Sequence, residues 1–213
     1  MHSIPEKLQN DIEIALKFLR NSGVVGFPTD TLYGIGARSL DPLAVERIYT
    51  IKRRSRTLGL PLLLGTFEDM ERVAIDIPQV AHNLAAKFWP GPLTLVLKKA
   101  KIIPAIVTGG NETVAIRVPN HPVPRALVAA LGDPITGTSA NKSGHPGAIS
   151  ALEVWNQLGD SVDHIIDGGL CPIGVESTIL DLTGKIPRLL RQGSISIEDI
   201  QTECDLIIEK DAT

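Results

Sequence analysis

Aromatic residues make up only 4% of the 213-residue chain, so its core must rest mainly on Ile, Leu, Val and Ala. Cysteine is also scarce: Cys171 and Cys204 are the only two, and they lie far apart in the sequence. Neither belongs to a Cys-x-x-Cys pair or a His/Cys cluster of the kind that binds zinc. This usage is typical of free thiols in a reducing cytoplasm, and it predicts no metal site built by the protein alone.

Long apolar runs are missing as well. Residues 1–7 have no signal-peptide core, and no segment approaches the ~20 apolar residues that cross a bilayer. The sequence therefore predicts a cytoplasmic protein with no membrane partner. The formal net charge of −3 argues against a protein that coats nucleic acid, although it leaves room for a local basic cleft.

Familiar catalytic motifs are absent. The chain has no Gly-x-x-x-x-Gly-Lys-Ser/Thr loop, no His-Glu-x-x-His helix and no Gly-x-Ser-x-Gly turn. What it does have is a hydrophobic content of 43%, which is enough for a sizeable core. No Pro/Ser/Gly-rich linker divides it, so we predict one domain that spans residues 1–213.

Apolar periodicity alternates between helical and strand spacing along the chain. It predicts helices at 8–20, 42–51 and 78–88, at 122–131, and from residues 66, 151 and 197. Short apolar or alternating runs predict strands at 24–27, 60–64, 93–98, 113–118, 134–136, 163–167, 177–181 and 188–193, and a closing strand at 204–208. Helices that alternate with strands are typical of an α/β domain.

The stretch from Pro134 to Gly147 organises the rest of the chain. It begins like a buried strand and continues as a loop of small residues, with the polar side chains of Thr138, Ser139, Asn141 and Ser143. A helix follows, with Ser150 at its cap and Glu153 in the capping-box position. Strand, polar loop and helix in this order is a layout with which α/β proteins bind anions and nucleotides. The same composition also fits a solvated loop.

Two further segments carry polar or charged groups beside predicted elements. Residues 28–36 place Thr29, Asp30, Thr31 and Tyr33 just beyond a strand, which fits either a ligand site or turn chemistry. The predicted helix at 42–51 is followed by Lys52-Arg53-Arg54-Ser55-Arg56. Cations favour a helix C-terminus, but so many like charges repel unless an anion lies among them. An anion cleft, an RNA patch and a solvated helix end all remain open.

Arg117 lies inside a predicted strand in which Val114, Ile116 and Val118 face one way, while Thr113, Ala115 and Arg117 face the other. An arginine in so apolar a strand needs a partner, either a core acid or an anionic ligand. The cations Lys52, Arg54, Arg117 and Arg191, together with many hydroxyls, suit the binding of polyanionic substrates. Phosphoryl and nucleotidyl transfer depend chiefly on such positioning and electrostatics.

Six segments, in order, resemble one family. They are Pro28-Thr-Asp-Thr-Leu-Tyr-Gly, Lys52-x-Arg54, Trp89-Pro-Gly-Pro-Leu-Thr, Arg117-Val-Pro, Thr138-Ser-Ala-Asn-Lys-Ser-Gly and Glu176-Ser-Thr-Ile. The chain is similar in these to the YrdC/Sua5 family, the L-threonylcarbamoyladenylate synthases of tRNA t6A biosynthesis. The resemblance runs from about residue 10 to 195 and fits the short form, without the C-terminal Sua5 domain of longer members.

The resemblance implies a single-domain α/β fold, with a twisted mixed sheet flanked by helices and a concave, positively charged cleft. It implies a nucleotidyltransferase that converts L-threonine, bicarbonate or CO2, and ATP into threonylcarbamoyl-AMP and pyrophosphate, usually with Mg²⁺. The product would pass to the t6A transferase machinery, and direct tRNA binding stays open. By motif position, threonine would meet Thr31, Tyr33, Leu63, Arg117, Gly137 and Ser177.

By the same resemblance, ATP would contact Arg54, Leu58, Thr113, Ser139, Asn141, Gly147 and Arg191, and Lys52 with Arg54 would meet the phosphates as catalytic cations. The segment Leu58-Gly-Leu-Pro-Leu-Leu-Leu64 departs from the Asn-Pro-Leu and histidine of many members, so contacts there are backbone or apolar. Ser55 also replaces a frequent proline. Two other hypotheses are a module that binds tRNA or double-stranded RNA, and a carbamoyl-transfer domain of the hydrogenase-maturation type.

Overall fold

The computed structural model describes residues 4–204 and 207–210 of the chain. Its helices are α1 (Glu6–Arg20), α2 (Pro42–Lys52), α3 (Met70–Val73), α4 (Gln79–Phe88), α5 (Ala105–Thr108), α6 (Pro122–Leu131), α7 (Ala151–Leu158) and α8 (Ile197–Cys204), with a 3₁₀ turn η1 (Gly159–Ser161). Its strands are β1 (Val25–Phe27), β2 (Gly34–Gly36), β3 (Leu62–Leu63), β4 (Ala74–Ile75), β5 (Leu93–Lys99), β6 (Thr113–Arg117), β7 (Ile135–Thr136), β8 (Thr138–Ser139), β9 (His164–Ile165), β10 (Thr178–Asp181), β11 (Arg188–Arg191) and β12 (Glu209–Lys210).

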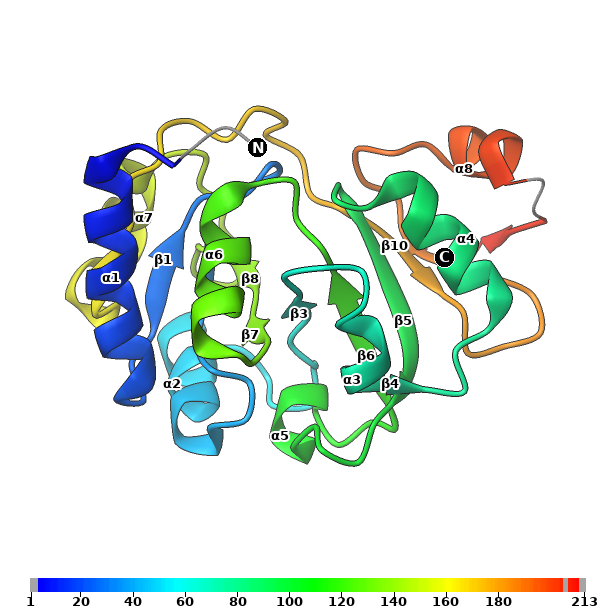
Figure 1. The fold of residues 1–213 in the computed structure, drawn as a ribbon, viewed down its shortest axis with the longest axis horizontal. Helices are drawn as coiled ribbons and strands as arrows, with labels where there is room; N and C mark the ends of the chain where they lie inside the picture. Colours follow the sequence, from blue (N-terminus) through cyan, green and yellow to red (C-terminus); the bar gives the residue numbers. More distant parts are fainter. Residues whose placement is uncertain (1–3, 205–206, 211–213) are drawn as a thin grey trace.

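The strands form two mixed sheets that lie beside each other (Figure 1). The smaller sheet has the order β8-β2-β1-β9, with β9 parallel to β1 and the other pairs antiparallel. The larger has the order β12-β11-β10-β5-β6-β3-β7, and β4 pairs with β5. An isolated bridge between Arg38 and Ile135 joins the sheets. The predicted α/β fold with a mixed sheet flanked by helices is confirmed, with the correction that the strands divide between two sheets.

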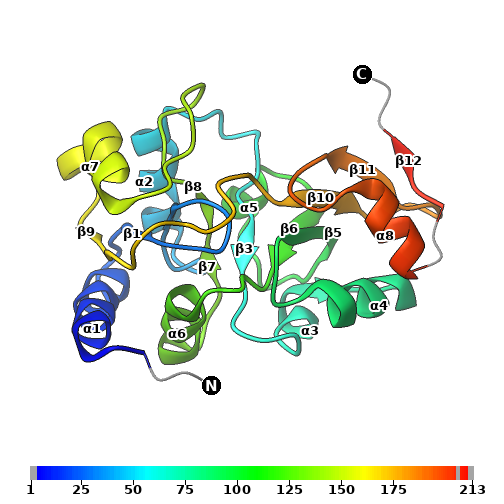
Figure 2. The ribbon, with the colours of Figure 1, turned by 90° about the horizontal axis from the view of Figure 1, so that it is seen from above.

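Helices cover the two sides of the strands unequally. Figure 2 shows α1, α6, α3 and α4 in a row along one side, while α2 and α7 lie against the other side of the smaller sheet. The alternation along β6 fits this arrangement, because Val114 and Ile116 join the buried core while Thr113 and Ala115 face a cavity. One face of the larger sheet is thereby left as the floor of a cleft.

Side-chain caps fix the starts of the helices that lead toward this cleft. Asp41 accepts hydrogen bonds from the backbone N–H groups of Leu43 and Ala44, as predicted for the start of α2. Ser150 likewise accepts the N–H of Glu153 at the start of α7. The Glu153 carboxylate accepts the N–H of Ile149, one residue before the position that a capping box predicts.

The core is aliphatic, as the composition predicts, and the few aromatic residues have defined places in it. Trp89 is only 9% exposed, and its indole N–H donates to the Leu93 carbonyl at 2.7 Å, so it is a core residue rather than a stacking platform. Phe27 and Leu127 belong to a second cluster of buried residues between β1, α1 and α6.

Three predicted boundaries are wrong. The helix predicted from residue 66 begins at Met70, because the Asp69 carboxylate accepts the N–H groups of Gly65 and Thr66 and holds a turn there. The strand predicted at 60–64 is only two residues long. The closing strand predicted at 204–208 is also wrong: residue 204 ends α8, residues 205 and 206 lie outside the described residues, and β12 pairs with β11 further along.

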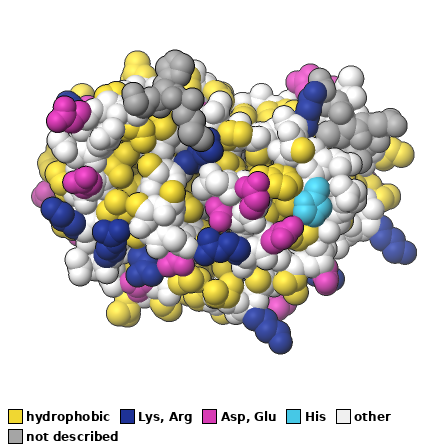
Figure 3. All heavy atoms as spheres, in the orientation of Figure 1, with side chains coloured by type: hydrophobic (Ala, Val, Ile, Leu, Met, Phe, Trp, Pro, Cys, Tyr) yellow, Lys and Arg dark blue, Asp and Glu magenta, His cyan; other side chains and the backbone are white. Residues whose placement is uncertain are grey.

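The face in Figure 3 carries Lys and Arg side chains interleaved with Asp and Glu, with hydrophobic side chains between them. This mixture does not provide the one-sign stripe that a general nucleic-acid-binding surface requires. None of the helices in the described part of the chain has the length and apolar composition needed to traverse a bilayer.

Candidate functional site

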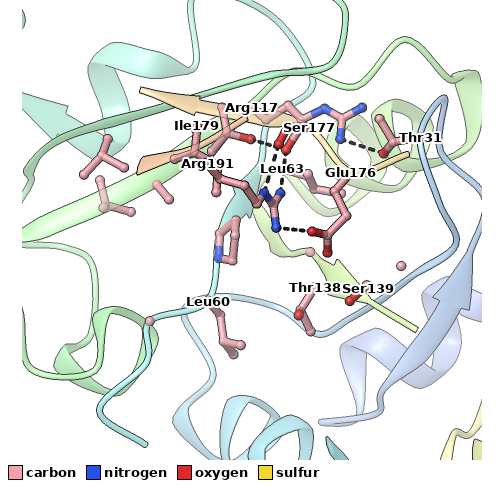
Figure 4. Close-up of a pocket in the computed structure, with 18 of the residues that line it drawn as sticks. Thr31, Leu60, Leu63, Arg117, Thr138, Ser139, Glu176, Ser177, Ile179 and Arg191 are labelled. Carbon is pink, nitrogen blue, oxygen red and sulfur yellow. Dashed lines mark hydrogen bonds and ion pairs between the residues drawn. The ribbon is translucent and has the colours of Figure 1, made fainter. Parts of the chain in front are cut away.

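The floor of the cleft is the face of the larger sheet opposite α3 and α4, and Thr108 of α5 also borders it. Successive strands each contribute alternate side chains to a cavity of about 370 Å³, among them Thr94 of β5, Thr113 and Arg117 of β6, and Arg191 of β11. The connections after β1 and before β10 supply Thr31, Tyr33, Glu176 and Ser177, and β8 supplies Ser139 (Figure 4). Segments that lie far apart in the sequence therefore converge on one cavity.

Arg117 lies at the inner end of this cavity, with only 6% of its surface exposed. One guanidinium nitrogen, Nη2, lies 2.5 Å from Oδ1 of Asp30, Nη1 donates to the Thr31 hydroxyl at 2.9 Å, and Nε donates to the Gly91 carbonyl at 2.9 Å. Sequence reasoning left a core acid and a ligand as alternative partners. The structure shows the core acid, while the guanidinium also borders the cavity with part of its five N–H groups uncommitted.

The sequence did not predict that Asp30 is the acid that pairs with Arg117. Its Oδ1 accepts from Arg117 and from the backbone N–H of Asn120, and its buried Oδ2 has no hydrogen-bond partner among the described residues. His121 lies next to Asn120 and accepts the Val123 N–H at its Nδ1, which caps α6. Burial lowers the pKa of His121 against the opposing influence of the Asp30 charge.

The loop after β1 is held in place by its own hydroxyls. The Thr29 and Thr31 hydroxyls are 2.9 Å apart, and Thr29 also donates to the Leu32 carbonyl at 2.7 Å. The Tyr33 hydroxyl donates to the Gly169 carbonyl at 2.8 Å and accepts the Gly168 N–H. Burial raises the pKa of Tyr33 to about 12, so this hydroxyl stays neutral and anchors the turn at 167–169 while its ring borders the cavity.

The opposite wall is built around Arg191. Its Nη1 lies 2.8 Å from the Glu176 carboxylate, and its Nε and Nη2 donate to the carbonyl and the hydroxyl of Ser177. The Ser177 hydroxyl is in turn 2.8 Å from that of Thr94. Burial lowers the pKa of the Arg191 guanidinium, and the Glu176 charge opposes that shift. This network places two cations, Arg117 and Arg191, on the same cavity.

Lys52 lies beside the first cavity, on the wall of a second one of about 260 Å³. Only 2% of the residue is exposed. Its ammonium group donates to the Ser139 carbonyl, to the Asn141 carbonyl at 2.8 Å and to the Asn141 side-chain oxygen at 3.0 Å. Burial and the nearby Arg54 charge lower the pKa of Lys52 to about 8. All of its hydrogen-bond partners are uncharged, so no carboxylate of the described residues is in direct contact with this cation.

Arg54 and Ser139 border both cavities, so the two cavities are neighbours. Arg54 donates to the carbonyls of Leu58 and Gly59, while the half-exposed Leu58 side chain lies on the second cavity. The Ser143 hydroxyl donates to the Lys52 carbonyl at 2.9 Å and ties the polar loop to the end of α2. The basic segment and the organising loop are therefore one structural unit, as an anion cleft requires.

Of four other predicted site residues, three border a cavity and one does not. Leu63 and Gly137 both border the first cavity and pack directly against each other, because the missing Gly137 side chain leaves room for Leu63. Asn141 borders the second cavity. Gly147 is not on either wall: it lies behind Leu32, whose Cδ1 would be 2.6 Å from a Cβ at residue 147. Gly147 thus contributes close packing rather than a cavity surface.

The residues present offer little to a divalent metal on their own. Among the described residues, no group of three or more His, Cys, Asp or Glu side chains is arranged to hold a metal ion. Glu176 is the single carboxylate that borders the first cavity in the described part of the chain. A Mg²⁺ ion would therefore need its oxygen ligands mainly from substrate phosphates and water.

Taken together, the fold and the cleft define an α/β protein with a cation-lined, hydroxyl-rich cleft of the class that binds anionic substrates. A family model described as "Telomere recombination", that of the Sua5, YciO and YrdC proteins, matches residues 17–193. The chain belongs to this Sua5/YciO/YrdC family, which confirms the resemblance read from the sequence.

Relatives of this chain fall into longer and shorter proteins. The chain is 45% identical over 190 residues to the threonylcarbamoyl-AMP synthase of Pyrococcus abyssi, covering 89% of this chain and 56% of that protein. It is 34% identical to the threonylcarbamoyl-AMP synthase of Vibrio vulnificus, covering 86% of this chain and 99% of that protein. The chain thus spans little more than half of the longer relative but nearly all of the shorter one.

Solved structures agree with this assignment. The structure of P. abyssi Sua5 complexed with L-threonine superposes with a TM-score of 0.91 at 42% identity, covering 97% of this chain and 61% of that one. The structure of E. coli YciO superposes with a TM-score of 0.82 at 29% identity, covering 93% and 95%. A nucleotide-bound HypF structure, at 18% identity and a TM-score of 0.75, shares the fold.

Proposed function

We propose that this protein is an L-threonylcarbamoyladenylate synthase, which makes threonylcarbamoyl-AMP and pyrophosphate from L-threonine, bicarbonate or CO2, and ATP. The observation that carries the proposal is the cleft itself, in which Arg117, Arg191 and Arg54 border one cavity together with several hydroxyls. The names of the relatives and the threonine complex of P. abyssi Sua5 support the same reaction. The product would serve t6A modification of tRNA, and a cytoplasmic location remains a prediction from the sequence.

Threonine would occupy the inner end of the cavity. The uncommitted N–H groups of Arg117 suit a carboxylate, because a guanidinium fork binds such an anion with two parallel hydrogen bonds. Thr31 and Ser177 supply hydroxyls close to it, and Tyr33, Leu63 and Gly137 shape the adjoining wall. The contact with Asp30 holds the Arg117 guanidinium in one orientation, so its N–H groups would be in place before threonine binds.

ATP would extend from Arg191 toward the second cavity. Arg54, Thr113, Ser139 and Arg191 border the first cavity, while Leu58, Asn141 and Lys52 border the second, and Gly147 supports the wall through Leu32. Lys52 and Arg54 are the cations that would meet the phosphates. A Mg²⁺ ion bound to the triphosphate would supply further charge neutralisation.

The chemistry needs two anions to meet. The threonine ammonium group loses one proton, and its nitrogen forms a bond to the carbon of bicarbonate. The bicarbonate hydroxyl leaves as water with a second proton from that nitrogen, and a carbamate results. A carbamate oxygen then attacks the α-phosphorus of ATP, the bond to the bridging oxygen breaks, and pyrophosphate leaves. Each cation at about 4 Å offsets about 4 kcal/mol of the repulsion at an effective dielectric constant of ~20, before desolvation costs. Fixed cations around the cleft are therefore suited to this step.

The test is pyrophosphate release by the purified chain in the absence of RNA. We expect release that requires ATP, L-threonine and bicarbonate together. Release that is independent of threonine, or none at all with tight RNA binding instead, would contradict the proposal.

A further inference from the structure

Glu176 borders the cleft, but the reaction outlined above assigns it no role. It precedes β10, and of the residues that the structure describes along the first cavity it is the single carboxylate. Its side chain is 47% exposed, and Figure 4 shows it directed into the cavity, between Arg191 and the Ser139 end of β8. Its position is therefore that of a group which can reach a bound molecule.

The backbone at Glu176 is held in place, whereas its half-exposed side chain can adjust to a ligand. The Glu176 carbonyl accepts the N–H of Ser194 at 3.0 Å, and Gly193 lies so close to residues 176–178 that no side chain fits there. Among the described residues, the carboxylate accepts a hydrogen bond from Nη1 of Arg191 at 2.8 Å. A carboxylate oxygen accepts more than one hydrogen bond, so Glu176 retains capacity to accept another donor.

A bound amino acid needs such an acceptor. Threonine carries an α-ammonium group as well as a carboxylate, and Arg117 can serve only the carboxylate. Asp30, the acid that pairs with Arg117, does not border the cavity: its Oδ1 already accepts two hydrogen bonds, and its Oδ2 is buried. An ammonium group in a cavity with Arg54, Arg117 and Arg191 would be repelled unless an anion faces it.

We propose that Glu176 binds the α-ammonium group of threonine and accepts the proton that this nitrogen must lose, a role that rests on the function proposed above. In this step one ammonium proton moves to the Glu176 carboxylate, and the neutral amine attacks the bicarbonate carbon. The new C–N bond forms, and the bicarbonate hydroxyl leaves as water with a second proton from the nitrogen. The carbamate keeps the negative charge, and Glu176 passes its proton to solvent.

The contact with Arg191 allows an alternative role for Glu176, in which its carboxylate only orients the Arg191 guanidinium. If Glu176 only orients Arg191, then its loss should weaken ATP binding and leave threonine binding intact. The variant Glu176→Gln separates the two roles, because an amide oxygen can still accept from Arg191 while the negative charge that attracts an ammonium group is gone. Glu13→Gln, on the exposed face of α1, is the matched control for the same chemical change.

The experiment measures binding by calorimetry for L-threonine and for 2,3-dihydroxybutanoate, in which a hydroxyl replaces the ammonium group. We expect the wild type to prefer threonine by at least about tenfold, and Glu176→Gln to lose most of that preference while its affinity for ATP changes less than about threefold. At saturating threonine, kcat should also fall at least about tenfold. Glu13→Gln should match the wild type in each measurement.

Each contrary outcome points to a different error. An unchanged preference for threonine in Glu176→Gln overturns the role in recognition, and an unchanged kcat overturns the role as proton acceptor. A loss of ATP affinity alone assigns Glu176 to the positioning of Arg191. If the wild type itself neither binds threonine nor releases pyrophosphate, the proposed function fails, and the role of Glu176 fails with it.

Discussion

Arg117 and Lys52 are both buried cations of the same cleft, but the protein neutralises only one of them. Arg117 lies 2.5 Å from the Asp30 carboxylate, whereas the Lys52 ammonium group is held by carbonyl oxygens and one amide oxygen. Because the Asp30 carboxylate balances its charge, the paired Arg117 guanidinium orients a ligand through its N–H groups but adds little net positive charge. An ammonium group without a counter-ion leaves a positive potential for a ligand to neutralise. The difference indicates that the Arg117 end orients a substrate, while the Lys52 end awaits negative charge.

The largest expected effect comes from breaking the buried pair. Arg117→Met should lower the free energy of unfolding by about 3–5 kcal/mol, because it leaves the Asp30 carboxylate buried without its partner. Asp30→Leu combined with Arg117→Met should recover at least about 2 kcal/mol of that loss, since no buried charge remains. Urea unfolding of both variants measures this difference.

The same variants also separate stability from recognition. The double variant should fold well but show a threonine KM raised at least about tenfold, because the carboxylate has lost its guanidinium. A single Arg117→Met variant as stable as the wild type, or a double variant with normal threonine kinetics, would show that the pair has neither role.

The next effect concerns the unpaired cation. Lys52→Met removes the donor of three hydrogen bonds but also relieves the cost of burying a charge, so its stability should fall by only about 1–2 kcal/mol. Turnover should fall about 100-fold or more, and by a larger factor than the affinity for ATP, if Lys52 stabilises charge that develops during the reaction. Pyrophosphate release and ATP titration give the two factors, and equal factors would instead indicate plain binding.

The smallest expected effect is on the pH dependence of stability. It concerns His121, whose pKa is also influenced by the Asp30 charge. Burial lowers the pKa of His121 in the folded protein, so near and below its ordinary value of about 6.5 the unfolded chain binds more protons at this residue. The stability that this residue contributes is therefore complete at neutral pH and is lost as the pH falls. His121→Asn keeps a capping side chain for α6 and removes the titration.

We expect the free energy of unfolding to fall more steeply for the wild type than for His121→Asn between pH 7 and pH 5. Unfolding curves at both pH values measure the difference between the two proteins. Equal losses would mean that the burial of His121 has no effect on its protonation.

The sequence was a good guide where a pattern is local. The caps at Asp41 and Ser150, the two faces of β6 and the helix at Pro122–Leu131 follow from periodicity and side-chain chemistry within a few residues. The division into two sheets did not, since β2 (Gly-Ile-Gly) and β8 (Thr-Ser) are short segments whose composition resembles that of a loop. Their pairing depends on the tertiary approach of distant segments.

The candidate site was predictable as an inventory but not as a geometry. The cations and hydroxyls were identified from motifs, yet the pairing of Arg117 with Asp30 joins residues 87 positions apart, and no spacing encodes it. The exclusively uncharged partners of Lys52 and the placement of Gly147 behind Leu32 also arise only when the chain has folded.

The most direct test of the contrast between the two cations is an NMR titration of the Lys52 side chain, assigned by its loss in Lys52→Met. In the free protein the pKa of Lys52 should be about 8. Pyrophosphate should raise it by about one unit or more, because a nearby anion favours the charged form, whereas L-threonine should leave it unchanged. A pKa of Lys52 that does not respond to pyrophosphate, or that responds equally to threonine, would contradict the account.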